Sequence, residues 1–170
     1  MKIEQLSAKH PLAPNLAPLA RAAFEATYRP FNPDSLIDEY LTKHMSHASI
    51  QAELAEQTNI FLAAIDGGSL AGYVKLRENS PVDIELPDTM EIERIYAAAG
   101  QTGMGTGKLL MEAAIKTARD LGRKSVWLGV WENNLRAVRF YEREGFVCEG
   151  QVTFMMADDE QTDKLMVRRV

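Results

Sequence analysis

A glycine-rich stretch from Thr102 to Lys108, T-G-M-G-T-G-K, has residue types that suit the binding of a phosphate. Gly103, Gly105 and Gly107 let the backbone bend and approach a ligand closely. Beyond Lys108, apolar residues recur at intervals of three and four, which predicts a helix packed on a sheet. Free N–H groups and the helix dipole at the start of a helix attract an anion. The stretch is therefore predicted to be a phosphate-binding loop.

The spacing of this loop excludes two common nucleotide-binding motifs. A P-loop needs a glycine five positions before Gly107 and a Ser or Thr after Lys108, but Thr102 and Leu109 occupy these positions. A dinucleotide fingerprint that starts at Gly103 needs a glycine where Lys108 lies. The phosphate must therefore belong to another kind of ligand.

A second group of residues that could do chemistry lies between Asn134 and Phe146, in the pattern N-x-x-A-x-x-F-Y-x-x-x-G-F. Asparagine often precedes a helix, because its side chain accepts a hydrogen bond from a free backbone N–H. Ala137 and Tyr141 are four residues apart and are expected on one face of that helix. A tyrosine hydroxyl carries its proton at neutral pH, so the helix presents a candidate proton donor.

The order and separation of these two groups resemble the motifs of the GCN5-related N-acetyltransferases, the GNAT superfamily. The acetyl-CoA loop of that family reads Gln or Arg, two residues, Gly, one residue, Gly or Ala. Aligned on Gly105 and Gly107, this chain has Thr102 at the Gln or Arg position and Gln101 one place earlier. The Asn, Ala and Tyr of the second group match the late helix of the family.

The resemblance implies an α/β fold with a mixed, largely antiparallel sheet, flanking helices and a splayed central strand pair. It implies one N-acetyltransferase domain over residues 1–170, with acetyl-CoA as co-substrate and no metal. The residues that it assigns to acetyl-CoA are Ile95, Tyr96, Ala97, Thr102, Gly103, Met104, Gly105, Thr106, Gly107, Lys108, Asn134, Ala137 and Tyr141.

The implied reaction transfers an acetyl group to a primary amine. Such an amine has a pKa of about 10 and must lose a proton before it attacks. Glu91 and Glu93 are predicted to share a strand face with Ile95 and Ala97, where Glu93, directly or through water, is the candidate proton acceptor. The alternative is that both carboxylates are merely solvated. Tyr141 would protonate the leaving thiolate, and backbone N–H groups of residues 95–97 would stabilise the developing oxyanion.

Three further stretches resemble the bacterial spermidine/spermine acetyltransferases of the PaiA type. They are E-I-E-R-I-Y at 91–96, W-L-G-V-W-E-N-N at 127–134 and F-M-M-A-D-D-E-Q-T-D at 154–163. The acids Asp158, Asp159, Glu160 and Asp163 either bind a polycation or form an ordinary acidic surface loop. Two other interpretations remain open: an acetyltransferase for a protein N-terminus, an amino acid or an antibiotic, and a non-catalytic acyl-CoA-binding regulator.

The elements that must position these residues follow from hydrophobic periodicity and from turn residues. Strands are predicted over 2–6, 60–65, 70–76, 91–96, 125–131, 146–154 and 164–170. Helices are predicted around 19–26, from Asp34, over 48–57, over 108–121 and after Asn134, and residues 78–89, with Pro81 and Pro87, are predicted to be a loop. Gly72 suggests a bulge or a close backbone contact. Gly129, between Trp127 and Trp131 on one strand face, leaves a notch, which is either a packing compromise or a slot for a ligand.

Composition sets the broad class. The chain has 170 residues, is 46% hydrophobic and carries a net charge of −5, which predicts one soluble domain and disfavours nucleic acid as a partner. The N-terminus has no signal-peptide pattern, no apolar stretch is long enough to span a membrane, and Cys148 has no disulfide partner, so a cytoplasmic location is expected. Cys148 is expected to be buried. His44 and His47 lack a third metal ligand. The predicted partner is a small-molecule amine, and the chain is predicted to be a monomer or a homodimer.

Overall fold

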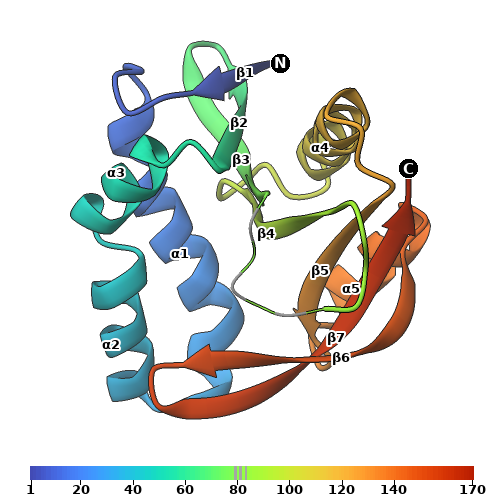
Figure 1. Ribbon diagram of the computed structural model, residues 1–170. Helices are drawn as coiled ribbons and strands as arrows, with labels where there is room; N and C mark the ends of the chain where they lie inside the picture. Colours follow the sequence, from blue (N-terminus) through green and yellow to red (C-terminus); the bar gives the residue numbers. More distant parts are fainter. Residues whose placement is uncertain (79, 81, 83) are drawn as a thin grey trace.

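The structure is a computed structural model that describes all residues except 79, 81 and 83, so the predicted loop residue Pro81 lies outside the described part (Figure 1). The strands are β1 Lys2–Leu6, β2 Asn59–Asp66, β3 Ser69–Arg77, β4 Thr89–Ala97, β5 Ser125–Trp131, β6 Val147–Met156 and β7 Asp159–Arg169. The α-helices are α1 Leu16–Tyr28, α2 Asp34–His44, α3 His47–Ala55, α4 Thr106–Asp120 and α5 Leu135–Arg143. Short 3-10 helices, Ala13–Asn15 and Arg29–Phe31, flank α1.

The described strands form one seven-stranded sheet in the order β1-β2-β3-β4-β5-β7-β6. Within the described residues, β4 and β5 pair in parallel, and the other neighbours pair antiparallel. The parallel pair holds only from Thr89↔Ser125 to Glu91↔Trp127, after which β4 and β5 diverge. The mixed, largely antiparallel sheet with a splayed central pair is therefore confirmed.

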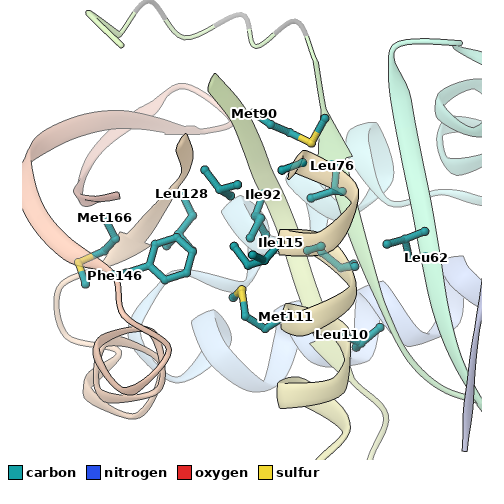
Figure 2. Packing of buried hydrophobic residues seen from close by; sticks show 14 of the residues in the cluster. Leu62, Leu76, Met90, Ile92, Leu110, Met111, Ile115, Leu128, Phe146 and Met166 are labelled. Atoms are coloured by element: carbon teal, nitrogen blue, oxygen red, sulfur yellow. The ribbon is translucent and has the colours of Figure 1, made fainter. Parts of the chain in front are cut away.

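Helix α4 covers one face of the sheet. Leu110, Met111 and Ile115 recur at helical spacing, and they pack against Leu62, Leu76 and Ile92 on three neighbouring strands. The same cluster continues toward β5, β7 and the start of β6 through Leu128, Met166 and Phe146 (Figure 2). This cluster anchors the helix that begins at the glycine loop.

Helices α1, α2 and α3 lie together on the opposite face (Figure 1). Leu16, Ala20 and Phe24 form the buried stripe of α1 and pack in one cluster with Phe61 and Tyr73 of the sheet. Within the range predicted for this helix, the cavity described below is lined by Leu19, Ala22, Ala23 and Ala26. One face of α1 therefore builds the core, and another forms a wall of the site described below.

Gly72 lies at a point of close backbone approach, as its position in a strand predicted. The register of β2 and β3 shifts between Ala64 and Ile65, next to this glycine. A Cβ atom at Gly72 would lie 2.6 Å from the backbone oxygen of Tyr96 and 3.0 Å from Cγ2 of Thr106. Both the bulge and the close contact are thus present.

Two expectations near the C-terminus were wrong. Strand β7 begins at Asp159 rather than at residue 164, because the charged residues pair with β6 in a long hairpin. The acidic residues therefore do not share one surface loop, and Asp163 is buried. Cys148 is exposed rather than buried, because it lies on β6, the edge strand of the sheet. Among the described residues, no helix is both long and apolar enough to cross a membrane.

Candidate active site

A cavity of about 930 Å³ opens where β4 and β5 diverge. Its walls are α1, the second half of β4, the end of β5 and the start of α5. The divergence removes the strand contacts that would otherwise fill this position. The sheet itself thus creates the space, and the motifs predicted from sequence lie around it.

Eight of the predicted site residues line this cavity. They are Glu93, Ile95, Tyr96, Ala97, Thr102, Asn134, Ala137 and Tyr141. The other predicted residues, from Gly103 to Lys108, follow Thr102 directly and form the turn into α4 and its first turn. Two motifs some thirty residues apart in the sequence therefore meet at one cavity.

The glycine loop has the geometry that anion binding requires. Gly103 and Gly105 have φ angles of 81° and 85°, which other residues adopt only with strain. The N–H of Leu109 donates to the oxygen of Gly105 at 3.0 Å, so the N–H groups of residues 105–108 precede the first hydrogen bond of the helix. A Cβ atom at Gly105 would meet no atom within 4 Å. The start of α4 is therefore open and presents free donors to an anion.

Gln101 contributes to this loop from one place before the Gln or Arg position of the family pattern, which Thr102 occupies. Its Oε1 lies 3.3 Å from the hydroxyl of Thr106, which donates to it. Thr106 is fully buried at the first position of α4. The hydrogen bond from Thr106 to Gln101 therefore stabilises the turn into α4, while Thr102 lines the cavity.

Helix α5 places Tyr141 at the cavity wall. Oδ1 of Asn134 accepts a hydrogen bond from the N–H of Ala137 at 3.2 Å, so Asn134 is the N-cap, as predicted. The ring of Tyr141 packs edge-on against Phe146, with the ring centroids 5.9 Å apart. Burial, and next the charge of Asp163, raise the pKa of Tyr141 well above its usual range. The hydroxyl therefore keeps its proton at neutral pH.

Backbone donors also face the gap between the diverging strands. The N–H of Ala98 donates to the oxygen of Ala71 on β3 at 2.8 Å. Backbone groups alternate in direction along a strand, so the N–H groups of Ala97 and Ile95 point away from β3, toward the gap. No strand pairs with β4 on that side beyond Glu91 in the described sheet. These donors are therefore available to a ligand.

The prediction that Glu91 and Glu93 share a strand face with Ile95 and Ala97 was wrong. Leu76 pairs with Ile92 and Lys75 with Arg94, so Glu93 is an extra residue in β4, a β-bulge. The bulge reverses the alternation beyond it. Ile95 consequently packs toward α4, whereas Tyr96 packs toward α1. Glu91 and Glu93 therefore do not share a face with Ile95 and Ala97.

Instead, Glu93 lies in an ion-pair network. Its carboxylate pairs with Lys75, with Arg94 at 3.3 Å and with Arg77 at 3.6 Å. Glu91 is held apart from the cavity by a bidentate pair with Arg77, at 2.8 and 2.9 Å. Although burial would raise the pKa of Glu93, the cations Arg94, Lys75 and Arg77 outweigh it and lower that pKa to about 2. Glu93 is thus ionised at the cavity wall, and it binds a proton weakly.

A protein-family description, Acetyltransferase (GNAT) family, matches residues 20–146 of the chain. The chain belongs to the GNAT acetyltransferase family. An uncharacterized N-acetyltransferase of Lactobacillus delbrueckii subsp. lactis is 33% identical over 170 residues, which cover 98% of this chain and 95% of that protein. The chain is therefore an acetyl-CoA-dependent N-acetyltransferase that acts on an amine.

Two other similarities are of different kinds, one in sequence and one in fold. The spermine/spermidine N(1)-acetyltransferase of Bacillus subtilis strain 168 is 30% identical over 80 residues, 46% of this chain and 49% of that protein. The crystal structure of the PaiA N-acetyltransferase from Thermoplasma acidophilum in complex with coenzyme A superposes with a TM-score of 0.80. It is 23% identical, with each chain covered in full, so this likeness concerns the fold.

The cavity of this acetyltransferase also contains residues that the sequence did not single out as ligands. Tyr28, Phe31 and Trp131 line it, and their rings lie close together. The centroid of Trp131 is 5.0 Å from that of Phe31 and 6.0 Å from that of Tyr28. Trp131 follows Gly129, which also lines the cavity, so the predicted notch lies at the site. Tyr28 and Phe31 gave no signal, because their place depends on how α1 docks on the sheet.

Proposed function

We propose that this acetyltransferase moves the acetyl group of acetyl-CoA to a polyamine such as spermidine or spermine. The observation that carries the proposal is a single cavity. It is lined by β4, which leads into the glycine loop, by α5 with Tyr141, and by the rings of Tyr28, Phe31 and Trp131. The similarity to the Bacillus subtilis spermine/spermidine enzyme and the net charge of −5 support a cationic acceptor. The predicted cytoplasmic location and oligomeric state remain predictions.

The residues around the cavity fit acetyl-CoA. Free N–H groups at the start of α4 suit its phosphates, and the open space at Gly105 lets them approach. The gap beside Ile95 and Ala97 suits an extended part of acetyl-CoA that accepts hydrogen bonds from their N–H groups. We assign residues 95–97, 102–108, Asn134, Ala137 and Tyr141 to the binding of acetyl-CoA. Bound there, acetyl-CoA supplies the thioester carbonyl that an amine attacks.

Three groups of this chain would then act in the transfer. The amine nitrogen bonds to the carbonyl carbon as the carbon–sulfur bond breaks. The N–H groups of Ile95 and Ala97 stabilise the negative charge that develops on the carbonyl oxygen. The Tyr141 hydroxyl gives its proton to the departing sulfur, which its raised pKa permits because the proton is present at neutral pH.

The proton that the amine loses needs an acceptor. Glu93, directly or through water, was the candidate from sequence, and this role remains a prediction. A pKa of about 2 disfavours direct transfer, because the carboxylate holds a proton only weakly. We therefore favour the route through water, in which Glu93 orients the water molecule and the proton passes on to solvent.

A panel of acceptors tests the substrate class. Release of free thiol from acetyl-CoA is followed with spermidine, spermine, a neutral-tailed alkylamine, a peptide with a free N-terminus and an aminoglycoside. We expect the highest kcat/KM with the polyamines, and a decrease as salt screens the attraction. A clear preference for the peptide or the aminoglycoside would reject the polyamine and leave the N-acetyltransferase activity in place.

A further inference from the structure

Asp163 on β7 is a buried carboxylate without a partner of its own. The residue is 6% exposed. Its side chain makes no hydrogen bond or ion pair among the residues that the structure describes, and burial is what raises the pKa of its carboxyl. Burying an unpaired carboxylate costs free energy, so such groups in proteins usually have a partner. A carboxylate in this state suggests that its partner is a ligand.

The carboxylate lies beside the cavity. Asp163 is opposite Trp131 in the β5–β7 register, so the two side chains lie on the same face of the sheet. A Cβ atom at Gly129 would lie 3.2 Å from Oδ2 of Asp163. Gly129 itself is exposed and lines the cavity. Asp163 is not itself a lining residue, so the space left by the missing side chain at Gly129 is the route by which a ligand in the cavity would reach its carboxylate.

The groups around Asp163 suit a cation. Tyr28 and Trp131 contribute rings whose faces attract cations, with centroids 6.0 Å apart. The titratable groups that face the carboxylate are the hydroxyls of Tyr28 on α1 and Tyr141 on α5. Burial, and next the charge of Asp163, raise the pKa of both hydroxyls. From β6, the register places apolar Val152 opposite Asp163. Lys164, next along β7, points to the other face of the sheet.

We propose that Asp163, together with the rings of Tyr28 and Trp131, forms the subsite that binds a protonated amino group of the acceptor. A carboxylate and aromatic faces in a partly dry cavity recognise an alkylammonium group and reject a neutral or anionic one. The inference deepens the proposed function and rests on it, since it makes Asp163 the residue that selects cationic amines. It also explains why an unpaired carboxylate lies in the interior.

Asp163→Asn tests the subsite, because the amide keeps the shape of the side chain and removes only its charge. Asp158→Asn is the matched control, since Asp158 is exposed in the turn of the same hairpin. We expect Asp163→Asn to raise the KM for spermidine by about ten- to a hundredfold, as for loss of a charged hydrogen bond. The affinity for coenzyme A and the KM for a neutral-tailed amine should change less than threefold. Asp158→Asn should leave all three within twofold.

A second variant tests the subsite independently, in case Asp163→Asn does not fold. Trp131→Leu removes a ring and leaves the carboxylate, and it should raise the KM for spermidine by about three- to tenfold. Calorimetry with spermidine alone, and separately with coenzyme A, then distinguishes a lost subsite from a lost fold.

Each result decides the inference separately from the proposed function. If the parent acetylates spermidine and Asp163→Asn keeps its KM, the subsite is refuted and the polyamine function stands. If the parent prefers another amine, the polyamine function fails, and direct binding of spermidine decides the subsite. Binding that Asp163→Asn weakens supports the subsite. Equal binding to both proteins, or none to the parent, overturns it.

Discussion

Glu93 of β4 and Lys75 of β3 form an ion pair between two neighbouring strands. Glu93 is the extra residue of the β-bulge, and the bulge directs its carboxylate toward the nearly inaccessible ammonium of Lys75. Glu53 of α3 also pairs with this ammonium, at 3.2 Å. Charges of both signs from β3, β4 and α3 thus alternate at the part of the cavity wall that Glu93 and Arg94 form. A network of this kind fixes positions, and the loss of one member leaves the others buried without full compensation.

We predict that Glu93→Gln affects stability more than catalysis. Removing one carboxylate from Lys75, Arg77 and Arg94 should lower the free energy of unfolding at pH 7 by about 2 kcal/mol, measured by urea denaturation. The kcat should fall by less than tenfold, because an amide can still orient a water molecule. Glu149→Gln, which removes an exposed partner of Arg169, is the control and should change stability by less than about 0.5 kcal/mol. A hundredfold loss of kcat at unchanged stability would instead make Glu93 the base.

The glycine loop gives a second prediction. Gly105→Val should abolish measurable binding of coenzyme A in calorimetry, because a branched side chain would occupy the open space where the phosphates approach. The φ of 85° also strains any β-branched residue, at a cost of about 1 to 3 kcal/mol.

The strain in this variant can be separated from the loss of binding. Gly122→Val, at the other end of α4, has a φ of 70° and likewise open space around its Cβ position. It should be destabilised to a similar extent and still bind coenzyme A. Equal affinity in Gly105→Val and the parent would remove this loop from the site.

Much of this fold could be predicted from local sequence patterns. Hydrophobic periodicity placed β1, the β2–β3 hairpin and α4, because each is determined by residues within one element. Asn134 marked the start of α5 for the same reason, since an N-cap bonds to its own helix. The two motifs of the cavity were likewise local, and the resemblance to a known family related them in space.

The errors arose where distant residues decide the outcome. The bulge at Glu93 adds one residue to β4 and reverses its alternation, and nothing in the pattern E-I-E-R-I-Y marks that extra residue. The start of β7 was missed because Asp159 and its neighbours have loop-like composition, although pairing with β6 extends the strand. The burial of Asp163 depends on Gly129 and on the docking of α1, which are remote in sequence.

Tyr141→Phe should lower kcat with little effect on stability. The ring keeps its packing against Phe146, and only the proton source is lost. General acid catalysis typically contributes about a hundredfold, or roughly 3 kcal/mol of the barrier, so we expect a loss of that size at saturating acetyl-CoA. Tyr40→Phe is the control, because Tyr40 stacks on Phe24 away from the cavity lining. A Tyr141→Phe enzyme within twofold of the parent, when chemistry limits turnover, would mean that water protonates the sulfur.

The last prediction concerns the pH dependence of stability that Asp163 imposes. Burial raises the pKa of its carboxyl from 3.8 to about 6. Well below pH 3.8 the carboxyl is protonated in both the folded and the unfolded state, so the group has no effect. As the pH rises from 4 to 6, the unfolded chain gives up this proton more readily, and the folded state loses stability relative to it. At pH 7 the accumulated cost is up to about 3 kcal/mol, from a shift of about two pKa units.

Asp163→Asn lacks this titration and should therefore be more stable than the parent at neutral pH. The difference in the free energy of unfolding, measured by urea denaturation from pH 4 to 7, should grow with pH and level off above about 6. Other groups titrate in both proteins and cancel in the difference, and Tyr28 and Tyr141 stay protonated throughout because their pKa values are raised. Saturating spermidine should narrow the difference at pH 7, because a bound ammonium compensates the carboxylate of the parent alone. A difference that does not vary with pH would show that Asp163 is not the buried, unpaired acid that the fold indicates.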